Sequence, residues 1–355
     1  MGSKDQYYEN IIKKISEHKD WGKRNPLDIG KECGYSEEEI FAALEIQQSE
    51  NKEEKEYFIL RNKVISVNLQ NRKVLLERKL NEKCNSEVKY GVLAWDDSEG
   101  IFEHGKNLYW ENLNTGDKGK FTLPEDETKK RRAGFSSMFK KGINKFWVLA
   151  DGILINSSSD FYKIDYNGTV NKLETDFWGA DVVVEDEKNI YVADLFSVWS
   201  VNKDLSEAKI LCKYDSGDSK TISALEKDDD KIYYHVFDEG IWNSYYYKYS
   251  IDGKRVNEDR FFSGKFSEKI GFVASPIEIF TTKHYKLHRN VIYSRETGQA
   301  VWGSSESLAF LGHAVTIFQK DLIYCTSARL WDDQQLGVTF FDLSRKTAPV
   351  LLPVQ

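Results

Sequence analysis

One strand pattern returns seven times between residue 64 and residue 343, and it restricts the chain to folds built from repeats. Each copy is a short run rich in Val, Ile, Phe, Tyr and Trp, the composition of a β-strand. Residues that favour turns, mainly Asn, Asp and Gly, follow most copies. The copies are Val64–Leu69, Leu108–Leu113, Phe161–Tyr166, Val198–Val201, Tyr245–Tyr249, Val291–Ser294 and Val338–Leu343, at a spacing of roughly 37 to 53 residues.

This spacing suits units of four antiparallel strands, with the run above as the third strand of each unit. We interpret a second set of apolar runs as the second strands. They are Tyr57–Leu60, Gly100–Phe102, Phe146–Leu149, Ile190–Val192, Ile232–Tyr234, Glu278–Phe280 and Leu322–Tyr324. Seven units predict an all-β fold, a seven-bladed β-propeller over residues 55–355. The first blade lacks an apolar innermost strand, because the residues before Tyr57 are charged. A six-bladed ring with an extra hairpin is the alternative.

Residues 1–54 predict a short α-helical segment ahead of the strands. Ile11, Ile12 and Ile15 recur at helical spacing, with Lys and Glu between them. Ser36 and Glu39 form a capping box, in which each side chain bonds to the other residue's backbone amide at the start of a helix. The segment loosely resembles a helix-turn-helix, but its second helix opens with three Glu residues, which phosphates repel. We therefore expect it to pack on the propeller or dock a partner.

Residues 179–201 carry the one recognisable repeat. Gly-Ala-Asp-Val-Val-Val-Glu-Asp-Glu-Lys-Asn-Ile-Tyr-Val-Ala-Asp, followed by Val198–Val201, resembles an NHL-type propeller blade. The same pattern occurs in gluconolactonase-like propellers. The first resemblance implies a WD40-like platform that binds protein or RNA. The second implies a divalent metal over the central channel, although no residue here can be matched individually to its ligands.

Long loops with aromatic and charged side chains are the predicted ligand-binding sites, because loops on a rigid scaffold commonly carry function. An exposed Trp is costly, so it either tucks under its loop or faces a ligand. The predicted ligand-binding residues are Trp178, Trp242, Trp331, Asp238, Asp332 and Arg329.

Carboxylates in the loops and turns could hold Ca²⁺ in the channel if three of them converged. The candidates are Asp96, Asp97, Asp151, Asp194, Asp238, Asp332 and Asp333. Asp194 and Asp238 are the predicted metal ligands, and we otherwise expect no cofactor. The alternative is that these side chains cap turns or face water.

The sequence contains no nucleophile motif, Walker loop or dinucleotide motif in a useful context. We therefore expect a non-catalytic scaffold that binds a protein or another macromolecule. A metal-dependent hydrolase of the lactonase type and a carbohydrate-binding propeller are the alternatives. The formal net charge of −7 argues against nucleic acid and anionic membrane as partners, and we expect a monomer.

The cysteines, Cys33, Cys84, Cys212 and Cys325, are far apart and form no CxxC pair. We expect buried free thiols, which favour a reducing compartment and a cytoplasmic location. The alternative is an exported protein whose leader has been removed.

Overall fold

A computed structural model describes most of the chain. The described residues are 3–19, 26–40, 43, 55–60, 62–68, 74–100, 104–124, 142–157, 160–174, 180–228, 231–239, 244–256, 276–281, 284–288, 291–302, 316–319, 322–327, 337–342 and 350–353. The chain divides into two compact units. Met1–Glu56 with Val67–Lys73 forms the helical unit, and Tyr57–Ser66 with Val74–Gln355 forms the strand unit.

The helical unit contains α1 (Ser3–Ser16), α2 (Pro26–Glu32) and a further helical turn over residues 37–40. Ile11, Ile15, Ile29 and Ile40 are fully buried against one another. The capping box is confirmed. The Glu39 amide donates to Ser36 Oγ at 3.2 Å, and the Ser36 amide donates to Glu39 Oε2 at 2.9 Å.

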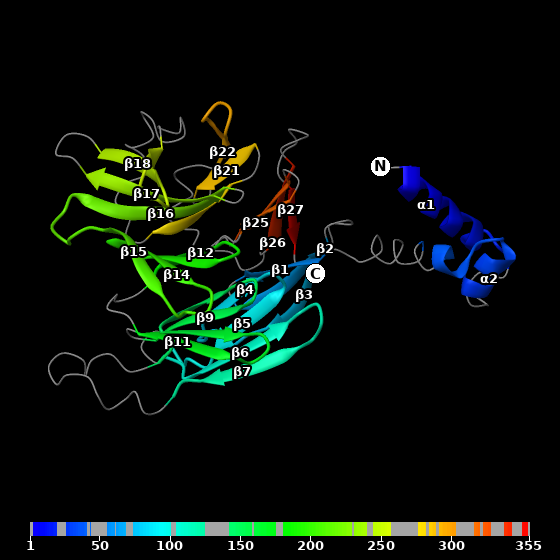
Figure 1. The fold of residues 1–355 in the computed structure, drawn as a ribbon, viewed down its shortest axis with the longest axis horizontal. Coiled ribbons are helices and arrows are strands. Elements are labelled where there is room, and N and C mark those ends of the chain that lie inside the picture. The colour runs from blue at the N-terminus through cyan, green and yellow to red at the C-terminus, as the bar shows by residue number, and fades with distance from the viewer. Residues whose placement is uncertain are drawn as a thin grey trace. The chain divides into compact units, whose positions relative to one another are not determined.

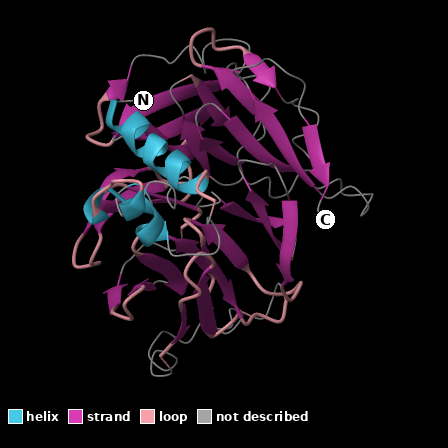
Figure 2. Ribbon diagram, turned by 90° about the vertical axis from the view of Figure 1, so that its right-hand side faces the viewer, coloured by secondary structure: helices cyan, strands magenta, loops and turns pink. Residues whose placement is uncertain are grey.

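The strand unit is a succession of antiparallel meanders in chain order (Figures 1 and 2). The first sheet has three strands, β1 (Lys55–Leu60), β2 (Lys63–Asn68) and β3 (Val74–Lys79). Two four-stranded sheets follow, β4 (Ser86–Lys89), β5 (Val92–Asp96), β6 (Asn107–Asn112), β7 (Lys118–Thr122), then β8 (Lys145–Val148), β9 (Gly152–Ser157), β10 (Asp160–Asp165), β11 (Val170–Glu174). The next sheet is β12 (Val182–Glu185), β13 (Asn189–Ala193), β14 (Ser197–Asn202), β15 (Ala208–Lys213).

Two further meanders are joined into one sheet. They are β16 (Lys220–Asp228), β17 (Lys231–Glu239), β18 (Ser244–Ser250), β19 (Arg255–Val256), and β20 (Ile277–Thr281), β21 (Tyr285–His288), β22 (Val291–Ser294), β23 (Ala300–Trp302). Their first strands, β16 and β20, pair in parallel, so the sheet has eight strands. The last sheet is β24 (Thr316–Gln319), β25 (Leu322–Ser327), β26 (Gly337–Asp342), β27 (Val350–Pro353).

The all-β class and the repeated four-stranded sheets are confirmed, and every predicted third strand is found as β2, β6, β10, β14, β18, β22 or β26. Three of the predicted second strands are wrong. Phe146–Leu149 and Glu278–Phe280 fall on the first strands β8 and β20. In the β4–β7 sheet the second strand is β5, not Gly100–Phe102. First and second strands are both largely buried, so an apolar run does not distinguish them. The number of blades and the boundary at residue 54 stay predictions.

Successive sheets pack face to face through apolar side chains. Leu108 and Trp110 of β6 pack against Ile153 and Ile155 of β9 in one buried cluster. Two further clusters join the β8–β11 sheet to the β12–β15 sheet and the β12–β15 sheet to the β16–β19 meander. These contacts make the strand unit a scaffold that holds its turns in fixed places.

No helix among the described residues is long and apolar enough to cross a membrane. Cys33, Cys84 and Cys212 are free thiols, as expected, but they are half-buried rather than buried. Cys325 has no described environment.

Candidate functional site

Five of the six predicted ligand-binding residues lie outside the described residues. They are Trp178, Trp242, Arg329, Trp331 and Asp332, and Asp333 lies outside as well. A ligand-binding role for these residues stays a prediction.

The two predicted metal ligands both bond to neighbouring turns or strands. Asp194 Oδ1 accepts hydrogen bonds from the Phe196 and Ser197 amides, at 2.8 and 2.6 Å, and from the Ser197 hydroxyl at 2.9 Å. Asp238 Oδ1 accepts one from Ser219 Oγ at 2.7 Å. The arrangement of Asp194 matches the turn-capping alternative, whereas Asp238 bonds to a side chain, and a metal-binding role for either residue stays a prediction.

Asp96 and Asp97 also serve the backbone around them. Asp96 is buried and accepts from the amides of Asn85 and Ser98, at 2.9 and 3.1 Å. Asp97 accepts from the amides of Lys106 and Asn107, and these bonds lower its pKa although burial opposes the change. Within the part of the chain that the structure describes, no three His, Cys, Asp or Glu side chains are grouped to hold a metal. Calcium in the channel stays a prediction.

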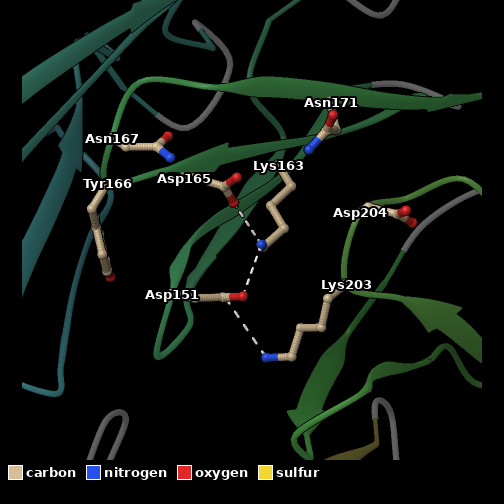
Figure 3. Close-up of a pocket in the computed structure, with 8 residues that line it drawn as sticks. All are labelled: Asp151, Lys163, Asp165, Tyr166, Asn167, Asn171, Lys203 and Asp204. Carbon is tan, nitrogen blue, oxygen red and sulfur yellow. Dashed lines mark hydrogen bonds and ion pairs between the residues drawn. The ribbon is translucent and has the colours of Figure 1, made fainter.

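Asp151, another of the predicted carboxylates, lines a pocket. The pocket has a volume of about 430 Å³, opens to solvent, and lies between the β8–β11 and β12–β15 sheets (Figure 3). Its lining is polar: Asp151, Lys163, Asp165, Tyr166, Asn167, Asn171, Lys203 and Asp204. We take this pocket as the candidate functional site.

Hairpin turns place these side chains. Asn167 and Gly168 form the turn between β10 and β11, where Asn167 Oδ1 accepts from the Thr169 amide at 2.9 Å. Gly168 has φ +92°, a backbone conformation that L side chains rarely adopt. The turn after β14 has no glycine. There Leu205 takes φ +59° and is buried, so the apolar core holds the turn that presents Lys203 and Asp204.

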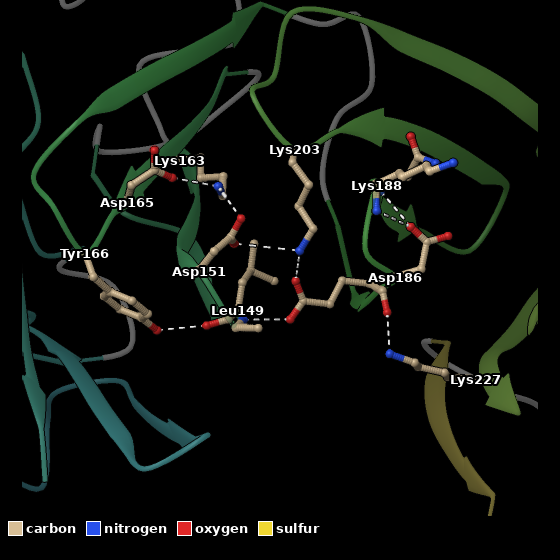
Figure 4. Close-up of polar contacts among 12 residues, drawn as sticks. Leu149, Asp151, Lys163, Asp165, Tyr166, Asp186, Lys188, Lys203 and Lys227 are labelled. Atoms are coloured by element: carbon tan, nitrogen blue, oxygen red, sulfur yellow. Dashed lines mark hydrogen bonds and ion pairs between the residues drawn. The ribbon is translucent and has the colours of Figure 1, made fainter. Parts of the chain in front are cut away.

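Asp151 joins the two lysines of the pocket (Figure 4). Lys163 Nζ lies 3.0 Å from Asp151 Oδ2 and 2.6 Å from Asp165 Oδ1, and only 4% of its side chain is exposed. Lys203 Nζ lies 3.7 Å from the other oxygen, Asp151 Oδ1, and also pairs with Glu185. Burial opposes the charge of Lys163, but its bonds to Asp165 and Asp151 raise its pKa. Both ammonium groups are therefore committed to carboxylates.

Backbone contacts hold this charged network in place. Glu185 Oε1 accepts from the Ala150 amide at 2.7 Å, and the Glu185 carbonyl accepts from Lys227 Nζ at 2.9 Å. Tyr166 donates its hydroxyl to the Leu149 carbonyl at 2.8 Å. Burial, and then the carboxylate charges of Glu185 and Asp151, raise the pKa of Tyr166, so its proton stays on the hydroxyl. The network thus connects β12 to the turn after β8 beneath the pocket.

The exposed charges of the pocket are mainly negative. About half of the Asp151 side chain is exposed, Asp165 is 26% exposed, and Asp204 lies at the surface. The lysines are recessed, since Lys203 is only 19% exposed. The described lining contains no Ser, Cys or His that could act as a nucleophile or as its base. The exposed part of the lining is therefore polar, and it carries more negative than positive charge.

A second polar group lies close to the pocket. Glu87 Oε2 accepts from the Val148 amide at 3.1 Å, and Lys89 Nζ lies 3.5 Å from Glu278 Oε1. Burial raises the pKa of Glu87 to about 7, with a further contribution from Glu278, while Lys89 and the amide bond oppose it. Lys89 and Glu278 belong to β4 and β20, strands that are far apart in the sequence.

Sequence reasoning identified Asp151 and the Asn167-Gly168 turn, but it did not find the lysines or Glu185. The sequence feature that indicates such residues is a charged residue inside an apolar strand, such as Lys163 between Tyr162 and Ile164. Such a side chain is buried only when it is paired. That rule also applies to Glu226, which follows Ile222–Leu225.

Comparisons with known proteins indicate no family for this chain. No family model and no curated protein matches it. Among solved structures, it resembles the extracellular domain of a one-component system from B. thetaiotaomicron (TM-score 0.39, 12% identity, 84% of this chain and 38% of that one). It also resembles the dihydro-heme d1 dehydrogenase NirN (0.46, 9%, 84% and 64%) and a chain of a mitotic checkpoint complex (0.47, 8%, 78% and 82%). The chain thus spans less than two thirds of the length of the first two of these proteins.

Proposed function

We propose that the chain is a β-propeller that binds a protein partner without catalysis, and that its pocket receives a basic side chain of that partner. The observation that carries the proposal is the pocket itself. Its two recessed lysines are paired with carboxylates, and the partly exposed Asp151 and the exposed Asp204 are the charged groups that an incoming donor would meet first.

The charge balance of the pocket favours a cationic group. Three carboxylates and two ammonium groups line it, and Glu185 beneath Lys203 adds a further negative charge. A guanidinium could bond to Asp151 or to Asp204, with the side-chain amide of Asn171 as an additional acceptor. An anionic ligand would meet these exposed carboxylates first, before the lysines behind them.

The repeated sheets support the propeller, and the Lys89–Glu278 ion pair supports its closure. That pair brings β4, in the first four-stranded sheet, to β20, four meanders further along the chain. Strands so distant in sequence meet if the sheets are arranged around a common centre.

The experiment measures binding of a fluorescent hexa-arginine peptide by anisotropy, using the full chain at two salt concentrations. The double variant D151N/D204N should bind about tenfold more weakly, because two partly exposed charge pairs contribute roughly 0.7 kcal/mol each. The matched control is E82Q/E99Q, which removes the same charge from two exposed side chains on other loops.

Equal losses in both double variants would contradict the proposal, since they would show attraction to the net charge alone. A citrulline peptide that binds as well as the arginine peptide would also contradict it, because citrulline keeps the shape of the side chain and lacks its charge.

A further inference from the structure

The contact between the β16–β19 and β20–β23 meanders differs from the other contacts between sheets. Apolar clusters join the earlier four-stranded sheets to one another and to β16–β19. Here β16 and β20 pair directly in parallel, Glu226 opposite Ile279, and charged side chains are buried beside the pairing.

Glu226 is the centre of this buried group and is fully buried itself. Its Oε2 lies 2.6 Å from His235 Nε2 and 3.1 Å from Lys248 Nζ. Its Oε1 lies 3.0 Å from Lys286 Nζ and accepts from the Thr281 hydroxyl at 3.0 Å. The group thus draws on five strands, β16, β17, β18, β20 and β21.

The strand register explains why these side chains meet. His235 stands opposite Ala224 on β16 and opposite Lys248 on β18, so all three lie on one face together with Glu226. Lys286 reaches the same face from the second meander. Lys248 Nζ also lies 3.9 Å from the centre of the Tyr233 ring.

Among the described members of the group, one carboxylate already faces two ammonium groups when His235 is neutral. Burial and the two lysines lower the pKa of His235, although Glu226 opposes them. The pKa of Glu226 is held well below its ordinary value by His235, Lys286 and Lys248, against the effect of burial. A proton on His235 would add a third positive charge beside Glu226, at a position where both side chains are fully buried.

We propose that the pairing of β16 with β20 is an acid-sensitive junction, which opens locally when His235 takes up a proton. The signs agree. A base whose pKa is lowered by folding favours the folded state fully above its unfolded value, near 6.5, and progressively less as pH falls below it. The carboxylate of Glu226 acts in the same direction below its own unfolded value, near 4.5. The described members of the apolar clusters between the other sheets include no histidine, so the opening at this pH is expected at this junction.

Hydrogen exchange read by mass spectrometry tests the junction on the full chain at pH 7.5 and pH 5.5, after correction for intrinsic exchange rates. Protection of peptides covering β16 and β20 should fall by up to about tenfold more than protection of β13 and β14, the internal reference, because one histidine with an unfolded pKa near 6.5 can change the opening equilibrium by no more than that between the two pH values. H235Q, which stays neutral and can still bond to Glu226, should remove this difference. H284Q, an exposed histidine in the loop before β21, is the matched control and should keep it.

An equal fall in all sheets, or an unchanged pH response in H235Q, would overturn the proposal. If H235Q does not fold, K248M provides the second test. It removes one of the cations that lower the pKa of His235, so the loss of protection between pH 7.5 and pH 5.5 should be smaller than in the wild type. A loss as large as in the wild type would equally overturn the proposal.

Discussion

Replacing Glu87 with glutamine is expected to stabilise the protein at pH 8 and to have little effect at pH 5. The side chain is half-buried, and burial together with Glu278 raises its pKa from 4.5 to about 7. The folded state therefore holds the proton more tightly than the unfolded chain. The free energy of unfolding that Glu87 contributes therefore falls as pH rises from 4.5 to about 7, and the size of this loss stays constant at higher pH.

The size of the effect follows from the pKa. A difference between 4.5 and about 7 corresponds to roughly 3 kcal/mol, and partial exposure of the side chain reduces this to about 2–3 kcal/mol at pH 8. At pH 5 the same relation gives less than about 1 kcal/mol. Glutamine keeps an oxygen that can accept the Val148 amide, so the hydrogen bond at 3.1 Å is preserved while the titration is removed.

Urea unfolding at pH 5, 6, 7 and 8 measures the free energy of unfolding of wild type, E87Q and the exposed control E99Q. The gain in E87Q should grow with pH, and E99Q should follow wild type. A gain of equal size at every pH, or a loss at pH 8, would refute the reasoning, because it would show that Glu87 is ionised in the folded protein at little cost.

Four further outcomes are expected. G119A should cost about 1–3 kcal/mol in urea unfolding, since its Cβ would lie 2.2 Å from the Trp110 ring; a neutral result would mean that the ring moves freely. S36A should remove the cap and raise hydrogen exchange at the amides of residues 37–40 about fivefold, equivalent to about 1 kcal/mol, and unchanged exchange would contradict the capping role. I153A, in a fully buried position, should cost about 2–4 kcal/mol, whereas L76A, 38% exposed, should cost under about 0.5 kcal/mol in the same assay. A thermal melt should be unchanged by EDTA; a fall of several degrees that Ca²⁺ reverses would instead support the channel metal.

The repeated strands can be predicted from the sequence because they depend on the preferences of neighbouring residues. β-Branched and aromatic side chains mark the strands, and Asn-Gly pairs such as Asn167-Gly168 mark the turns that need a positive φ. The Ser36–Glu39 capping box was readable for the same reason, since both partners are three residues apart. The order of strands within a sheet was less certain, because first and second strands bury similar side chains. Phe146–Leu149 was misassigned on that account.

The pocket and the buried ion group were decided by tertiary structure. Lys163 and Lys203 are 40 residues apart in sequence, and they converge on Asp151 because neighbouring sheets pack their turns side by side. Glu226 and Lys286 meet because β16 pairs with β20. The sequence by itself determined which residues form strands and turns, since those preferences act over a few neighbouring residues. Only the packed sheets decided which charges face one another, because electrostatic pairing depends on distance and burial, and no local pattern encodes either.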